Sequence, residues 1–358
     1  MSLNQRKKIL VLRYRFIGDT ILTVPFFRNL RRAEPEAHIA WVVAPGSSDV
    51  VKGIPYVDEL IYWDPATIHA DSRGGHRTLG AKLSFIRELR AKKFDKAYVL
   101  KRSFSSALIA LLSGARERVG FDTEGRRFML TRAVPYRPEQ HEVVSFLDLL
   151  RADGVPVTDD YLESWISADE ARKADELLQS HGVGGDARLL ALHPFGSIYQ
   201  KSWPMARFAE VARQLMERYG MTPLLLGAGG DRKEFEPWRH LFPHGCCDLV
   251  GGCDLRTTLA LLHRSALFLG NDSGVMHLAA SAGVPLLALF GPTSPDRFGP
   301  WGSRTRVIHT AFPCSPCRQK YFTQCEPAGE GRPECIMAIS VEQVCQACEE
   351  LIKETEVR

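Results

Sequence analysis

A four-residue turn in the last third of the chain has the residue types that bind an anion. The turn, Asn271-Asp272-Ser273-Gly274, lies between an apolar run that predicts a strand and a second run that predicts a helix. The first N–H groups of a helix have no partner within it, and the helix dipole adds partial positive charge there. A diphosphate suits this position, and Gly274 would let it approach the backbone. Asp272 or Ser273 would equally cap the helix without a ligand.

Two other stretches carry side chains that suit a phosphate. His277 lies one helical turn after Gly274, although a buried His is more often a core residue than a ligand. In the loop after the strand predicted for residues 187–194, the Ser197 hydroxyl can donate to a phosphate and Lys201 can supply positive charge. An isolated Lys is usually a solvated surface residue. The position of Lys201 at the end of a strand, just before a Trp-Pro pair that fixes a helix start, favours the ligand.

A glycine-rich turn follows another predicted strand. Residues 227–230 read Gly-Ala-Gly-Gly, and Asp231 comes next. This spacing is weak support for a nucleotide, because it lacks both the full dinucleotide fingerprint and the Lys-Ser/Thr pair of a P-loop. Asp231 would contact ribose hydroxyls or, equally, cap the helix that follows.

A carboxylate follows the first predicted strand. In the run RFIGDTILTVP, Gly18 makes a turn and Asp19 is the first polar residue of a helix. Asp at a helix start is ordinarily explained by the helix dipole alone. A carboxylate that faces a cleft between domains can instead act as a general base, and both interpretations stand for Asp19.

All nine cysteines lie after residue 245. Disulfides are not expected in a cytoplasmic chain, and packing of free thiols in a C-terminal loop is the interpretation that we favour. Cys345 and Cys348, three residues apart in a predicted helix, should pack in a core. Zinc is the alternative, because a Cys-x2-Cys pair followed by two further cysteines can bind it, and this pattern is formed by Cys314, Cys317, Cys325 and Cys335.

The length of 358 residues exceeds what one ordinary core holds, so we expect two domains. Short apolar runs that predict strands alternate with longer runs that predict helices, first over residues 1–160 and again over 166–338. This alternation predicts an α/β fold with doubly wound parallel sheets covered by helices on both faces. Ligands of such folds lie beyond the carboxyl ends of the strands, where the polar stretches described above are placed.

The charge is unevenly distributed along the chain. Residues 1–160 hold 26 Lys and Arg against 19 Asp and Glu, a net +7, whereas the remainder holds 20 against 23, a net −3. A basic half suits an anionic partner or an anionic membrane face, although such a surplus also serves solubility alone. No apolar run approaches the roughly 20 residues of a membrane span, and no secretory signal is recognisable, so we expect a cytoplasmic protein.

Four blocks together resemble glycosyltransferase family 9, the bacterial heptosyltransferases. They are RFIGDTILTVP near the start, then HPFGSIYQKSWPMARFAEVARQL, LLLGAGGDRKEFE and GNDSGVMHLAASAGVPLLALFGPTSP. The blocks span most of the chain in the family's order. The last is the most specific, and its Asn-Asp-Ser-Gly-x-Met-His run looks more like the second heptosyltransferase group than the first. The cysteine-rich stretch departs from the family's best-known members and puts the local structure and metal content there in question.

The resemblance implies a GT-B architecture, in which two Rossmann-like domains face each other across a cleft. The last helix, here within residues 339–358, often crosses back to the first domain in that family. The implied activity is transfer of L-glycero-D-manno-heptose from ADP-heptose to the inner core of lipopolysaccharide, with no cofactor required. The partners would be ADP-heptose and an anionic lipid A–inner core acceptor, with peripheral contact to the cytoplasmic face of the inner membrane and no nucleic acid.

The resemblance also implies roles for individual residues. Asp19 would be the general base of a single, inverting displacement, and Lys201 would hold the diphosphate. No Asp-x-Asp pair suits a divalent ion, so the scheme requires no metal. The site for the ADP-sugar would further include Ser197, Asp231, Asp272, Ser273, Gly274 and His277.

Three other interpretations stay open. A sibling enzyme of the same fold would use a different nucleotide-sugar donor or a different acceptor. A Rossmann oxidoreductase is disfavoured, because no Gly-x-Gly-x-x-Gly follows the first predicted strand. A binder without catalytic activity is disfavoured by the presence of both Asp19 and Lys201.

Overall fold

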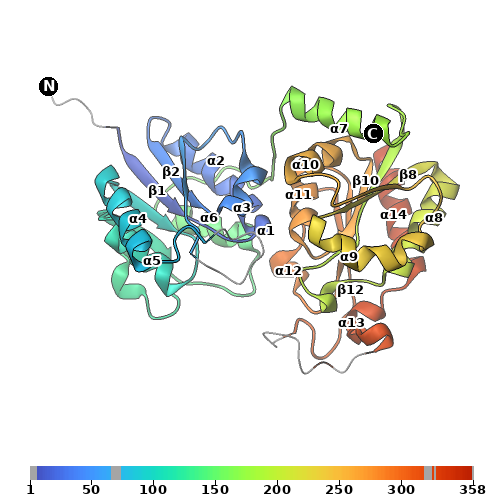
Figure 1. Cartoon of the computed structure of the whole chain (residues 1–358). Helices are drawn as coiled ribbons and strands as arrows, with labels where there is room; N and C mark the ends of the chain where they lie inside the picture. Colours follow the sequence, from blue (N-terminus) through green and yellow to red (C-terminus); the bar gives the residue numbers. More distant parts are fainter. Residues whose placement is uncertain (1–5, 66–73, 318–324, 326–327, 357–358) are drawn as a thin grey trace. The chain divides into compact units, whose positions relative to one another are not determined.

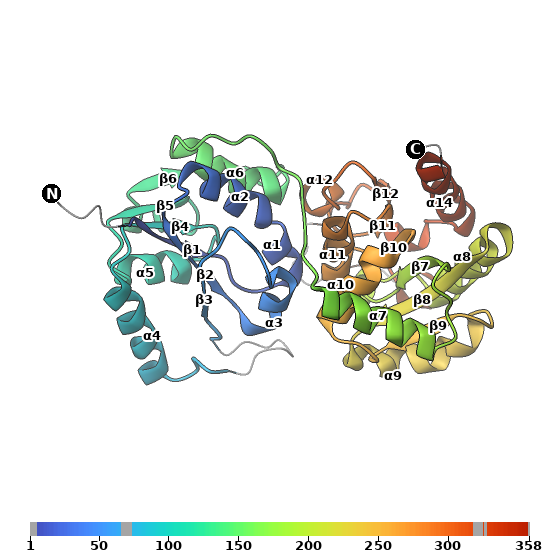
Figure 2. The ribbon, with the colours of Figure 1, turned by 90° about the horizontal axis from the view of Figure 1, so that it is seen from above.

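The computed structural model describes residues 6–65, 74–317, 325 and 328–356. The chain divides into two compact units, Met1–Tyr161 and Leu162–Arg358. In each unit, helices cover both faces of a parallel sheet (Figures 1 and 2). No helix among these residues is long and apolar enough to cross a membrane.

The first unit is built on a six-stranded parallel sheet, counted over the described part of the chain, with the order β3-β2-β1-β4-β5-β6. Its central strand β1 pairs with β2 and β4, so that Val11 lies opposite both Trp41 and Tyr98. Ile9 to Leu12 are fully buried, as expected for a strand covered on both faces. The strands are β1 (Lys8–Leu12), β2 (His38–Val43), β3 (Glu59–Tyr62), β4 (Lys96–Val99), β5 (Glu117–Phe121) and β6 (Arg132–Val134).

The helices of this unit lie on the two faces of the sheet. Figure 2 shows α2 and α6 on one face and α4 and α5 on the other. Their bounds are α1 (Ile17–Ile21), α2 (Val24–Ala33), α3 (Pro45–Ser48), α4 (Leu79–Lys92), α5 (Phe104–Leu112) and α6 (Glu142–Ala152).

The second unit repeats the plan with a parallel sheet of six strands within the described residues, in the order β12-β11-β10-β7-β8-β9. Numbered from its own first strand, this sheet has the same 3-2-1-4-5-6 order as the first, which is the doubly wound order of Rossmann folds. The predicted α/β fold class is therefore confirmed for each unit. The strands are β7 (Arg188–His193), β8 (Met221–Gly227), β9 (Cys247–Val250), β10 (Leu267–Asn271), β11 (Leu286–Phe290) and β12 (Thr305–His309).

Capping chemistry sets the start of the first helix in this unit. The Ser167 hydroxyl accepts from the Glu170 N–H at 3.2 Å, and the Glu170 carboxylate accepts from the Ser167 N–H at 2.8 Å. This capping box is the one that the sequence predicts. The helices are α7 (Ala168–Ser180), α8 (Met205–Tyr219), α9 (Arg232–Phe235), α10 (Leu255–Arg264), α11 (Gly274–Ala282), α12 (Pro295–Phe298), α13 (Glu334–Met337) and α14 (Val341–Glu356).

The C-terminal helix α14 packs within the second unit. It contacts α8, β10 and β11, and its apolar face joins the core of that unit. Cys345 and Cys348 lie in this core and are almost fully buried, which confirms the expectation that they serve packing. The expected crossing of this helix to the first domain stays a prediction, and the face that packs within the second unit is its apolar one.

In each sheet the strand order reverses beside the unit's first strand. The reversal lies between β1 and β4 in the first unit and between β7 and β10 in the second. Chains that leave two such strands run toward opposite faces of the sheet, so their loops separate and leave room for a ligand at the carboxyl edge. The two edges therefore define where functional side chains should be sought.

Candidate active site

Loops from three neighbouring strands meet at the carboxyl edge of the second sheet. Lys201 follows β7, Asp272 follows β10 and Thr293 follows β11. The Lys201 ammonium lies 2.7 Å from Asp272 Oδ2, and the Thr293 hydroxyl donates to the same oxygen at 2.6 Å. Lys201 and Asp272 are largely buried. Because a carboxylate repels an anion, Asp272 would orient Lys201 for the phosphates of a ligand rather than contact those phosphates itself, and its predicted place in the ADP-sugar site stays a prediction.

The Asn271 side chain fixes the distance between two of these loops. Its amide donates to the Pro194 carbonyl at 2.8 Å and accepts from the Trp203 N–H at 3.0 Å. The residue is completely buried, so both bonds form away from water. Asn271 therefore ties the end of β10 to the loop that carries Lys201.

Ser273 is the N-cap of α11. Its hydroxyl accepts from the Met276 N–H at 3.3 Å and lies 3.3 Å from His193 Nδ1. Burial lowers the pKa of His193 to about 4, so this ring is neutral at physiological pH. The helix thus begins with Gly274, and His277 is buried one turn further on. Of the two predicted caps, Ser273 takes the position and Asp272 does not.

The loop that carries Lys201 is held by a residue that sequence reasoning missed. Arg332 is buried, and its guanidinium donates to the Ser202 carbonyl at 2.8 Å and to the Tyr199 hydroxyl at 2.7 Å. Ser197, in the same loop, is exposed. Arg332 is 130 residues from Ser202 in the chain, so no local pattern connects them.

The glycine-rich turn after β8 is explained by packing and capping. A Cβ on Gly227 would lie 2.6 Å from Phe195 Cε2, so only glycine fits there. Asp231 Oδ2 accepts from the Ala228 N–H at 2.7 Å, and burial raises the pKa of this carboxyl. The local capping interpretation of Asp231 therefore accounts for its side chain. Gly229 faces open space.

Asp19 lies in the first turn of α1, at the carboxyl edge of the first sheet. Its carboxylate forms an ion pair with Arg13, which is almost fully buried and also lies over the Phe146 ring. The helix follows two residues with left-handed backbone, Arg15 at φ 81° and Phe16 at φ 57°. Such conformations are unfavourable for residues with a side chain and concentrate at functional sites.

A lysine follows β4 at the same edge. Lys101 lies with its ammonium 4.9 Å from the centre of the Tyr14 ring. Burial, together with the positive charges of Arg13, Arg15 and Arg102, lowers its pKa to about 7 against the opposing effect of Asp19. Sequence reasoning missed this lysine, because nothing local marks it as buried.

This edge has more positive charge than its carboxylate can balance. Within the described residues, the Nε atoms of Arg13 and Arg15 are buried and have no hydrogen-bond partner. Donors that are buried without an acceptor are costly. The cluster of Arg13, Arg15 and Lys101 beside Asp19 is therefore suited to an anionic ligand.

The four cysteines proposed as zinc ligands differ in exposure. Cys314 is exposed, Cys317 and Cys325 are half-buried and Cys335 is buried. Burial raises the pKa of Cys335 to about 11, with further contributions from Cys325 and Cys314. Among the described residues, no group of three or more His, Cys, Asp or Glu side chains is arranged to hold a metal ion. The geometry thus gives the zinc alternative no support.

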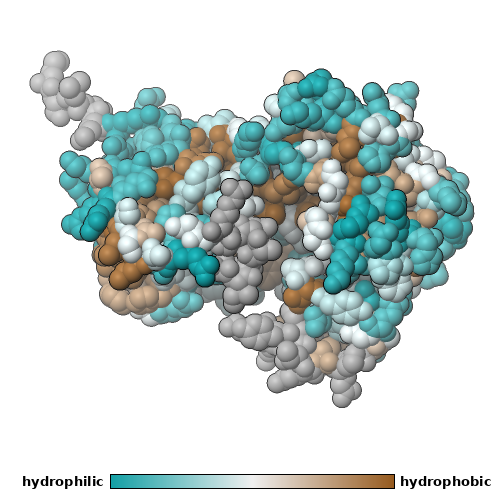
Figure 3. Space-filling model, viewed as in Figure 1, coloured by the Kyte–Doolittle hydropathy of each residue, from teal (hydrophilic) through white to brown (hydrophobic). Residues whose placement is uncertain are grey.

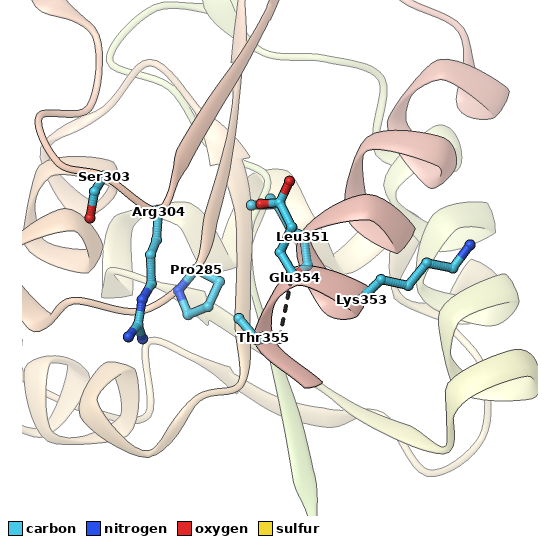
Figure 4. A pocket seen from close by; sticks show the side chains of 7 residues that line it. All are labelled: Pro285, Ser303, Arg304, Leu351, Lys353, Glu354 and Thr355. Atoms are coloured by element: carbon cyan, nitrogen blue, oxygen red, sulfur yellow. Dashed lines mark hydrogen bonds between the residues drawn. The ribbon is translucent and has the colours of Figure 1, made fainter. Parts of the chain in front are cut away.

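A pocket of about 430 Å³ lies in the second unit, away from the carboxyl edge of its sheet. It is lined by the residues shown in Figure 4 and is placed at the amino ends of β11 and β12, beside the end of α14. The Lys353 side chain points away from Pro285 and Arg304. Ligands of doubly wound sheets bind at the opposite, carboxyl ends, so we do not assign the reaction to this pocket.

Comparisons with known proteins show what the chain is similar to. The model of glycosyltransferase family 9 (heptosyltransferase) matches residues 82–325. Lipopolysaccharide heptosyltransferase 2 of Escherichia coli strain K12 is 26% identical over 370 residues, covering 98% of this chain and 99% of that protein.

Two solved structures are similar over nearly the whole chain. The glycosyl transferase family 9 protein from Veillonella parvula DSM 2008 aligns with a TM-score of 0.84 and 28% identity, over 99% of both chains. E. coli ADP-heptose lps heptosyltransferase II aligns with a TM-score of 0.77 and 25% identity, over 98% of this chain and 99% of that one.

Two glycines of the turn after β8 give a matched pair. Gly227→Ala should lower the free energy of unfolding by about 1–3 kcal/mol, because the new methyl overlaps Phe195. Gly229→Ala should change it by less than about 0.5 kcal/mol, because its methyl meets open space. Urea unfolding of both variants measures the difference. Equal losses would show that packing does not explain Gly227.

Lys101→Met should change the pH dependence of stability. The folded pKa of about 7 lies below the ordinary 10.5, so the charged lysine destabilises the fold fully below pH 7. This penalty disappears as pH rises from 7 to about 10.5, where the unfolded chain also loses the proton. The variant should therefore be more stable than wild type at pH 7, with the gap closing toward pH 10.5. Parallel stability curves from chemical denaturation would contradict the buried, low-pKa lysine.

Proposed function

The chain belongs to glycosyltransferase family 9, and we propose that it moves L-glycero-D-manno-heptose from ADP-heptose to the inner core of lipopolysaccharide. Membership makes it a glycosyltransferase. The names of its relatives, such as lipopolysaccharide heptosyltransferase 2, support the donor and the acceptor. The observation that carries the proposal is the Lys201–Asp272 pair at the start of α11, because it places an oriented cation where a sugar diphosphate would lie.

In this proposal the second unit holds the donor. The diphosphate contacts Lys201 and the first N–H groups of α11 at Ser273 and Gly274, with Ser197 and His277 near it. Negative charge grows on the diphosphate as its bond to the sugar breaks, and a cation that is already oriented stabilises that charge without reorganising. Asp272 and Thr293 fix the position of the Lys201 ammonium.

The first unit supplies the base. Asp19 takes the proton from the acceptor hydroxyl, and the resulting oxygen attacks the anomeric carbon as ADP leaves from the opposite side. One displacement of this kind inverts the anomeric configuration. Arg13 orients the Asp19 carboxylate through their ion pair, which holds the base in one geometry before the acceptor binds.

The positive cluster beside Asp19 would receive the acceptor. Arg15 and Lys101 lie at the edge that carries the base, and the proposed acceptor bears carboxylates and phosphates. A bound anion restores the higher pKa of Lys101, because an opposite charge favours the ammonium form. Acceptor binding would thus be coupled to uptake of a proton near neutral pH.

The proposed reaction requires no metal ion, because Lys201 and the amides of α11 provide the charge that offsets the leaving diphosphate. The enzyme would act in the cytoplasm, at the inner face of the inner membrane. An alternative is a glycosyltransferase of the same fold with another donor or acceptor, since the residues that read the sugar are not fixed by these motifs.

Asp19→Asn should lower kcat about 10²–10⁴-fold, the usual contribution of a general base, and leave ADP affinity unchanged. The amide keeps the size of the side chain and loses the ability to accept a proton. Asp49→Asn, an exposed carboxylate of the same unit, serves as the control and should behave as wild type. Single-turnover transfer and ADP titration provide the two readouts. Near-normal turnover of the Asp19 variant would remove it from the role of base.

Lys201→Ala should lower kcat about 10²–10³-fold, because the leaving diphosphate loses its oriented cation. The single change also leaves Asp272 buried without its ion pair, which lowers stability for a separate reason.

The double variant Lys201→Ala/Asp272→Asn separates these two effects. It should regain thermal stability and stay slow, whereas a purely structural role for Lys201 would restore turnover together with stability. Lys233→Ala, at an exposed lysine of the same unit, is the control.

A further inference from the structure

Helix α5 exposes an apolar stripe that no part of its own unit covers within the described residues. Phe104, Leu108, Leu111 and Leu112 follow the spacing i, i+4, i+7, i+8 and are 43%, 38%, 38% and 41% exposed. The opposite face of the helix, which includes Ala107 and Ala110, is completely buried in the core. A surface helix normally alternates an apolar face with a polar one, and α5 is apolar on both.

A second segment extends this stripe. Phe128 lies in the short 3-10 helix η2 (Arg127–Met129), which contacts α5. It is 74% exposed, and its ring centre lies 6.3 Å from that of Phe104. Figure 3 shows hydrophobic surface over α5 and the segment after it, with hydrophilic residues beside it. An apolar patch rimmed by polar residues marks an interaction surface.

The patch lies in a basic part of the chain. Residues 79–132 hold 13 Lys and Arg against 5 Asp and Glu, a net +8, whereas the first unit as a whole has a net +7. Arg116 and Arg127 are exposed just after α5 and in η2. Arg90 of α4 lies beside Gly114, with its Cγ 3.8 Å from the place of a Cβ there. The segment that carries the apolar stripe thus has a positive surplus in its sequence, and Arg90, Arg116 and Arg127 are exposed side chains of it.

We propose that α5 and η2 form a surface that rests on an anionic lipid membrane. The phenylalanine and leucine side chains would enter the region between headgroups, and the surrounding arginines and lysines would contact anionic headgroups. A second copy of the chain fits this surface less well, because two faces of the same strong positive charge repel each other. A membrane supplies both the apolar and the anionic complement.

The position of the surface along the chain supports this occupant. Lys101 lies in the short connection between β4 and α5, and Phe104 is the first residue of α5. The cluster assigned to the anionic acceptor and the apolar stripe are thus consecutive along one segment. This step rests on the proposed function, in which the acceptor is itself a lipid held in the membrane.

Vesicle flotation tests the surface without any need for activity. The full chain is mixed with vesicles of phosphatidylcholine alone or with about 30% phosphatidylglycerol. Wild type should float with the anionic vesicles only, and salt should weaken the binding. Leu111→Glu should lower the bound fraction about tenfold or more, because a charge replaces apolar area that enters the lipid.

Leu241→Glu is the matched control. Leu241 is 39% exposed, close to the 38% of Leu111, and it lies in the second unit. It should bind vesicles as wild type does. Equal binding by the two variants, or no binding by wild type, would overturn the proposal. The proposal would also be overturned if light scattering showed that wild type is a dimer and that Leu111→Glu is a monomer, because a second copy would then cover the stripe.

Transfer assays then separate this surface from the proposed reaction. Leu111→Glu should match wild type with a water-soluble inner-core acceptor and be slower with the same acceptor embedded in anionic vesicles. Equal rates on the embedded acceptor would contradict a role for the surface in delivering substrate. If neither protein transfers heptose to either acceptor, the proposed function fails while the flotation result stands.

Discussion

The reversal of strand order beside the first strand of each sheet is the constraint on which the rest of the site depends. It forces the loops after β1 and β4, and those after β7 and β10, to leave one sheet edge in opposite directions. Side chains at the base of those loops then lie at the edge where ligands of doubly wound sheets bind. Both units place a carboxylate there with a cation as its partner: Asp19 with Arg13, and Asp272 with Lys201.

The two ion pairs differ in the charges that surround them, and this difference favours a different role for each pair. Around Asp272 the groups balance, because Thr293 and Lys201 both contact one carboxylate oxygen and His193 is neutral. The carboxylate therefore holds the ammonium in one position, which suits the phosphate contact that we propose for Lys201. Around Asp19, Arg15 and Lys101 leave excess positive charge beside a base. A buried charge cluster of this kind lowers stability, so its presence is better explained by ligand binding than by folding.

Much of the fold could be predicted from the sequence, because central strands such as β1, β7 and β10 are uninterrupted apolar runs. The edge strands β6, β9 and β12 could not be, since they are short or half-exposed and gain their hydrogen bonds from a neighbour. In the site, Ser273 and Lys201 could be identified from the sequence because each follows a predicted strand. Asn271, Thr293 and Arg332 act across long separations, so their roles appear only when the chain is folded. Lys101 could not be identified from the sequence, because no local pattern predicts that it is buried beside arginines.

The most direct test of the account is the identity and configuration of the product. The purified chain is incubated with ADP-heptose and a defined inner-core acceptor in the presence of a chelator, and the product is identified by mass spectrometry and NMR. The account predicts transfer of a single heptose with inverted anomeric configuration, at a rate that added Mg²⁺ does not change. Retention of configuration, dependence on the metal, or transfer only from another nucleotide sugar would contradict it.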